Sequence, residues 1–226
     1  VHDQPWSGYN WYQGNATSVI QVNLDLPIYI DRALDLACHE GYPGHHVYNV
    51  LLEHHLVRGR GWVEYSVYPL FSPQSLIAEG TANFGIDLAF PGDQRAAFER
   101  DTLFLLAGLD PAQADRFYRI QHMVERLSYA GNEAARRFLD GAMTAEQAAQ
   151  WLQLYSLMSP ARAAQRVRFI ERYRSYVINY NLGRDMVAAY VERKVAAGQG
   201  GSGAEAKWRV FGELLGSPRL PSGLTQ

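Results

Sequence analysis

The chain repeatedly places a helix-capping side chain directly before a proline. Residues 72–73, 110–111 and 159–160 read Ser-Pro, Asp-Pro and Ser-Pro. A side-chain oxygen at the cap accepts a backbone N–H, and proline is well tolerated at the first helical position. The segments that follow are rich in Ala, Leu, Arg, Gln and Glu, which all favour helix. The sequence therefore predicts a mainly α fold with about nine helices and very little sheet.

The sequence shows few signs of a domain boundary. Thr144 and Gln147 form a capping box at a further helix start. The aromatic, turn-rich residues 1–15 are expected to form a loop packed on the domain. A Gly/Ser run at 198–203 predicts a flexible connector. We expect residues 1–226 to form a single catalytic-type domain.

Composition excludes several classes of protein. Hydrophobic residues make up 47% of the 226 positions and charged residues 19%, which is ordinary for a packed soluble protein. The chain contains no run of about 18 apolar residues, which a transmembrane helix would need. The formal net charge of −2 argues against a nucleic-acid partner, and the single cysteine, Cys38, excludes an internal disulfide. Compartment and oligomeric state stay open.

The strongest chemical signal is the segment 39–46, which reads H-E-G-Y-P-G-H-H. Zinc hydrolases use a histidine followed by glutamate, with a second histidine one turn on, to present two ligands and a general base.

The usual spacing is H-E-x-x-H, whereas His39 and His45 are six residues apart. On an undistorted helix that separation is about 9 Å and about 600°, which places the rings on different faces. Pro43 and its flanking glycines can break the helix, so that a bulge absorbs the two extra residues. His46, about 10.5 Å along the axis, is the rival second ligand.

Two acidic residues complete the predicted centre. Glu40 directly follows the first histidine and is the expected general base. Hydrolytic zinc also needs a third protein ligand. Glu79 lies in an apolar helical stretch with small neighbours, where a charge is costly unless it is paired or ligated and where another helix can approach closely. Glu64 is nearer in sequence but lacks helical context, and it remains the alternative.

A segment with period-two alternation precedes this box. In residues 18–26 the apolar side chains alternate with polar ones, which predicts a half-buried strand with Ile20, Val22 and Leu24 buried. Consecutive elements with short connections tend to be neighbours. We therefore expect this strand to lie beside the metal helix and to line the cleft, with Asn23 facing an extended substrate.

The box resembles that of a bacterial family of zinc peptidases known as a domain of unknown function, whose pattern is H-E-x-x-P-G-H-H. Asn23 before the box and residues 79–80 after it belong to the same resemblance. More distantly, the box is similar to the H-E-x-G-H pattern of the carboxypeptidase Taq and angiotensin-converting-enzyme families. Matching the Gly-His pairs places His45 on their second zinc ligand and leaves Pro43 in a two-residue insertion.

The resemblance extends from about Tyr12 to about Tyr190, and it implies that the chain is the C-terminal half of a longer family member. Residues 180–183 match a Tyr-x-x-Gly signature of the family. The family often has Pro-Gly-Gln ahead of this tyrosine, and residues 174–176 depart from it. The resemblance implies a mostly helical, zincin-like fold and peptidase chemistry.

Three tyrosines follow one helical stripe near the end of this region. Tyr173, Tyr176 and Tyr180 lie at positions i, i+3 and i+7, close to Arg172 and Arg184. Core packing explains such a stripe equally well. The functional interpretation is that the Tyr180 phenol stabilises an oxyanion and that an arginine binds a substrate carboxylate.

The sequence thus predicts a zinc-dependent metallopeptidase with a mainly α, zincin-like fold. Zinc would be held by His39, His45 and Glu79, and Glu40 would take the proton of a water that attacks a peptide substrate. Two alternatives remain, which are a catalytically inactive metal-binding or interaction domain and a hydrolase of a non-peptide amide or ester.

Overall fold

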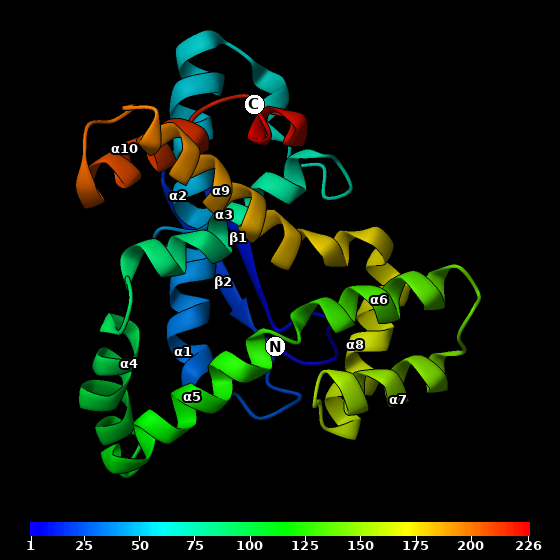
Figure 1. Ribbon diagram of the computed structural model, residues 1–226. Helices are drawn as coiled ribbons and strands as arrows, with labels where there is room; N and C mark the ends of the chain where they lie inside the picture. The colour runs from blue at the N-terminus through cyan, green and yellow to red at the C-terminus, as the bar shows by residue number, and fades with distance from the viewer. The chain divides into compact units, whose positions relative to one another are not determined.

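The computed structural model describes residues 1–226, and it confirms a mainly α fold with one two-stranded sheet (Figure 1). The elements in chain order are β1 (Gly8–Gly14), β2 (Thr17–Val22), α1 (Ile30–Leu36), η1 (Ala37–Gly41), α2 (His45–Leu52), η2 (Glu53–Arg58), η3 (Val63–Ser66), α3 (Gln74–Ala89), α4 (Gln94–Phe98), η4 (Glu99–Phe104), η5 (Pro111–Gln113), α5 (Ala114–Glu125), α6 (Ser128–Leu139), α7 (Ala145–Tyr155), α8 (Pro160–Tyr173), η6 (Arg174–Asn179), α9 (Asn181–Ala196), α10 (Gly203–Leu215) and η7 (Pro221–Leu224). None of the helices combines the length and the apolar character that a membrane crossing requires.

Most of the predicted caps begin helices. Asp110 and Ser159 each accept a backbone N–H from the helix that follows, at 3.0 and 3.4 Å. Thr144 and Gln147 make both bonds of the capping box. Ser72 differs, because the proline after it is itself the cap residue of α3 and the Ser72 hydroxyl makes no cap bond. Local side-chain chemistry therefore sets the start of several helices, as expected from the sequence.

The chain forms two compact units. The first consists of Val1–Ser7, Asn23–Ala33 and Gly92–Ile178, and the second of Gly8–Val22, Leu34–Pro91 and Asn179–Gln226. Each unit is thus assembled from three separate stretches of chain.

The second unit is built around α3 and α9, which pack against each other. Helix α10 contacts both of them and also α2, while η1 packs on α3. Buried apolar side chains from these helices form its core, including Leu52, Leu56, Ile77, Phe84, Val187, Val191, Phe211 and Leu214. Burial of this apolar surface holds the helices in place around the box.

The first unit contains α4 to α8. Helix α7 packs against α6 and α8, and a small cluster of Phe104, Ala114 and Tyr118 joins η4 to the start of α5. Glu99 is fully buried beside this cluster. Its carboxylate is paired with Arg95 at 2.9 Å and accepts the Tyr118 hydroxyl, so the buried charge is compensated.

Strand β1 lies where the sequence predicted a loop. It pairs antiparallel with β2 across a tight turn at Asn15 and Ala16, whose φ values are 52° and 53°. A two-residue hairpin turn of this hand usually carries Asn-Gly, because glycine adopts positive φ without steric cost. Alanine at the second position removes that signal from the sequence.

The predicted burial of the following strand is wrong. Strand β2 is shorter than expected, and Ile20 and Leu24 are 44% and 56% exposed. Asn23, expected to face substrate, is buried instead, and its side-chain amide donates to the carbonyls of Gln4 at 2.8 Å and Trp6 at 3.0 Å. The reason is that Asn23 follows Val22, the last paired residue of β2, and that its amide ties this end of the strand to the N-terminal segment.

Candidate metal centre

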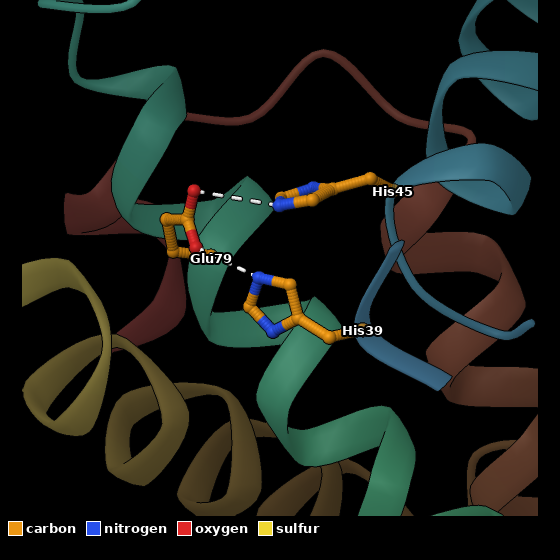
Figure 2. Close-up of side chains that lie close together, drawn as sticks. All are labelled: His39, His45 and Glu79. Carbon is orange, nitrogen blue, oxygen red and sulfur yellow. Dashed lines mark ion pairs between the residues drawn. The ribbon is translucent and has the colours of Figure 1, made fainter. Parts of the chain in front are cut away.

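Three of the predicted ligand residues meet at one point (Figure 2). The side chains of His39, His45 and Glu79 point toward one another, and one potential ligand atom from each lies within 4.8 Å of the others. The Nε2 atom of His39 is 3.1 Å from Oε2 of Glu79, and Nε2 of His45 is 3.4 Å from Oε1. Ligand atoms about 2.0–2.2 Å from a tetrahedral ion lie roughly 3.4 Å apart. This group could therefore hold a metal ion.

The box delivers its two histidines by breaking the helix. Helix α1 continues into the π-helical turn η1, which carries His39. Tyr42 is then extended, with φ −116° and ψ 119°, and α2 begins at His45. The two imidazole centroids are 4.7 Å apart. The two extra residues are thus absorbed by a π turn followed by a complete break rather than by a bulge in one continuous helix.

Small and rigid residues make this break possible. The Gly44 N–H donates to the Cys38 carbonyl at 2.9 Å, and a Cβ on Gly44 would lie 1.9 Å from the His39 carbonyl oxygen. No side chain fits there. The Pro43 ring packs on α3, where a Cβ on Gly85 would lie 2.8 Å from its Cγ. These contacts seat the break against the helix that carries the acidic ligand.

The rival ligands lie elsewhere. His46 is buried, and its Nδ1 is 2.8 Å from the Ser18 hydroxyl on β2. The exposed ring of Tyr42 lies 5.0 Å from the His46 ring. Glu64 is exposed in η3 and does not join the group. The structure therefore places His45 next to His39, whereas His46 and Glu64 lie outside the group.

Helix α3 presents Glu79 at a close helix crossing. The side chain of Glu79 is only 6% exposed. Its neighbour Gly80 contacts Gly183 of α9 so closely that a Cβ on Gly80 would lie 2.5 Å from the Gly183 carbonyl. The small residues around this glutamate thus admit a second helix, as the sequence suggested.

Electrostatics in the group favours a cation. Burial alone would lower the pKa of His39, but the hydrogen bond and charge of Glu79, with a further contribution from Glu40, raise it to about 9. Burial would raise the pKa of Glu79, but the charge of His45 and the hydrogen bonds from both histidines hold it well below its usual range. A metal ion bound here would replace a proton beside an ionised carboxylate.

Glu40 is buried beside the group but is not one of its three potential ligands. It is 4% exposed, and no protein group donates a hydrogen bond to its Oε2 atom. Strand β1 lies against it, since the Asn10 amide donates to the Glu40 backbone carbonyl at 2.6 Å and a Cβ on Gly8 would lie 3.0 Å from its Oε1 atom. A buried carboxylate oxygen with no donor from the protein is uncommon and marks Glu40 as a candidate functional residue.

Two residues from other elements adjoin His39. The ring of Tyr180, the cap residue of α9, is stacked with the imidazole at a centroid distance of 6.3 Å. Asn83, which the sequence analysis missed, lies 2.9 Å from Nδ1 of His39 through its Oδ1 atom. The available signal was its position four residues after Glu79, which places both on one face of α3.

The predicted substrate-binding residues are engaged differently. Arg184 pairs with Asp87 at 2.8 Å, which links α9 to α3. Arg172, in the first unit, is exposed, and its guanidinium carbon lies 6.0 Å from the centroid of the Tyr173 ring. Asn23 also belongs to the first unit, where its amide donates to the backbone carbonyls of Gln4 and Trp6. None of these contacts involves the metal group.

Comparisons with known proteins return no match for the chain among family models, curated proteins or solved structures. The geometry of the centre is defined by its own residues. That geometry establishes a buried His-His-Glu group that could bind a metal ion.

Proposed function

We propose that the protein is a zinc-dependent hydrolase that cleaves peptide bonds. One observation supports this most directly: the His39, His45 and Glu79 group adjoins the buried Glu40 carboxylate, which has an oxygen without a protein donor. Two histidines and one glutamate form a ligand set used by catalytic zinc, which keeps one coordination position open. Structural zinc sites more often close the coordination with a fourth protein ligand.

Each residue near the group has a defined task in this proposal. Zinc, when bound, supplies an activated water and polarises a carbonyl. Glu40 accepts the proton of the attacking water and returns it to the leaving amine. The phenol of Tyr180, whose ring lies against His39, donates a hydrogen bond to the oxygen of the attacked carbonyl as negative charge develops there.

The choice of peptide substrates comes from the resemblance of the box and the Tyr-x-x-Gly segment to zinc peptidase families. Asn23 and Arg184 are not available as substrate ligands. The Asn23 amide is buried and bonded within the protein, and the Arg184 guanidinium is paired with Asp87. Substrate recognition in this proposal therefore depends on the metal group and its immediate neighbours.

The test combines metal analysis with turnover. The full chain is purified, its metal content is measured by mass spectrometry, and a library of internally quenched peptides is assayed before and after treatment with a chelator. We expect near-stoichiometric zinc, cleavage of a subset of peptides, loss of cleavage with chelator and recovery with added zinc. Bound zinc without cleavage of any peptide, amide or ester would contradict hydrolysis and leave a metal-binding domain.

A further inference from the structure

The amide of Asn83 has only one possible orientation. Its Nδ2 atom lies 2.8 Å from the backbone carbonyl of Tyr180, and its Oδ1 atom lies 2.9 Å from Nδ1 of His39. A carbonyl can only accept, so the NH2 group must face Tyr180 and the amide oxygen must face the histidine. That oxygen also only accepts, so Nδ1 of His39 carries a proton.

We propose that Asn83 is the positioning residue that fixes the His39 imidazole for metal binding, and that its own orientation is set by the backbone carbonyl of Tyr180, the cap residue of α9. With the proton held on Nδ1, the lone pair available to a cation is on Nε2, the atom that faces Glu79. The inference rests on the metal centre of the proposed function and not on hydrolysis.

The surrounding helices hold this arrangement in register. Glu79 and Asn83 are four residues apart, so one face of α3 supplies both a ligand and the group that orients another ligand. The contact between Gly80 and Gly183 fixes how closely α9 approaches α3, which places the Tyr180 carbonyl within reach of the amide. A segment 97 positions away in sequence thereby helps to orient a metal ligand.

The amide is also electrically neutral. Glu40 and Glu79 already place two carboxyl groups near His39, and both contribute to its raised pKa. A neutral acceptor orients the ring without a third negative charge. Aspartate at this position would still accept the Nδ1 proton, but it could not donate to the Tyr180 carbonyl.

Two variants of the full chain test the role of Asn83. Zinc dissociation constants are measured by competition with a chromogenic chelator for wild type, Asn83→Ala and Asn83→Asp. Outer partners of metal-bound histidines are typically worth about 10- to 100-fold in metal affinity. We expect Asn83→Ala to weaken zinc binding by this amount and Asn83→Asp to restore most of it. Asn83→Ala with wild-type affinity would overturn the proposal.

The control removes a different contact between the same two helices. Asp87→Asn breaks the ion pair with Arg184 and leaves Asn83 untouched. Zinc affinity should stay within about twofold of wild type, because a half-exposed pair contributes little. If Asp87→Asn weakened zinc binding as much as Asn83→Ala did, helix packing rather than ring orientation would be responsible, and the proposal would fail.

A spectroscopic readout isolates the ring itself. In the zinc-loaded protein labelled with ¹⁵N-histidine, nuclear magnetic resonance should show a slowly exchanging Nδ1 proton on His39. Asn83→Ala should lose this protection while circular dichroism reports an unchanged helical fold. If Asn83→Ala weakened zinc binding but the wild-type protein cleaved no peptide, the positioning role would be supported and only the proposed hydrolysis would be contradicted. A wild-type chain that bound no zinc would overturn both.

Discussion

Gly80 of α3 and Gly183 of α9 meet backbone to backbone. A Cβ on Gly80 would lie 2.5 Å from the carbonyl carbon and oxygen of Gly183, and a Cβ on Gly183 would lie 2.7 Å from the Leu76 carbonyl oxygen. The contact is one residue from Glu79 and three residues from Tyr180. The crossing therefore sets how near the helix with the acidic ligand lies to the helix with the phenol.

Alanine at this crossing should destabilise the fold. Gly80→Ala forces a methyl group into backbone atoms that cannot rotate away, and overpacking of this kind typically costs about 1–3 kcal/mol. Urea denaturation of the metal-free protein measures the change in the free energy of unfolding. Gly212→Ala is the matched control, because nothing lies within 4 Å of the added Cβ in α10, and the change should be neutral or stabilising by about 0.5–1 kcal/mol. Equal stability of Gly80→Ala and wild type would contradict the close crossing.

The two adjacent histidines of the box should differ sharply in their effect on metal binding. His45→Ala removes one of three ligands, so zinc content after dialysis should fall severely. His46→Ala removes a hydrogen bond to Ser18 and should retain zinc, at a stability cost of about 1 kcal/mol. Mass spectrometry of the metal and thermal unfolding measure both effects. Zinc retained in His45→Ala and lost in His46→Ala would reverse the assignment.

The parts of the centre that follow from local sequence could be predicted. A few consecutive residues are enough to recognise the His-Glu pair, the Pro/Gly break and the lone charge in an apolar helix. The choice of His45 over His46 was harder, because it depends on the helix stopping completely before His45. An undistorted helix places His46, rather than His45, on the same face as His39.

Partners that are distant in sequence could not be predicted. Asn83 orients His39 only because α9 supplies a carbonyl 97 positions further on, and Asn10 contacts Glu40 from 30 positions upstream. No local pattern encodes such pairs. Strand β1 was missed for a different reason, since Ala16 adopts a positive φ that a sequence pattern assigns to glycine.

Glu40 should be needed for turnover and not for metal binding. Glu40→Gln keeps the size of the side chain but removes its ability to accept a proton. Because general acid–base help is typically worth about 10²–10⁴ in rate, peptide cleavage should fall at least a hundredfold while zinc content stays unchanged. Steady-state kinetics with the best library peptide measures the loss. Near wild-type cleavage by this variant would exclude Glu40 as the base and leave the metal centre in place.

A single methyl group on β1 should displace the Glu40 carboxylate. A Cβ on Gly8 would lie 3.0 Å from Oε1 of Glu40 and 2.7 Å from Cδ2 of Leu36, so at least one of these side chains must move. Misplacement of a reacting group by about 1 Å can cost 10²-fold in rate. We expect Gly8→Ala to lower kcat at least tenfold while zinc content and the midpoint of thermal unfolding change little, because the ligands lie on other elements. Gln13→Ala, at an exposed position of the same strand, should leave kcat unchanged. A Gly8→Ala variant with normal kcat would show that the carboxylate does not depend on β1 for its position.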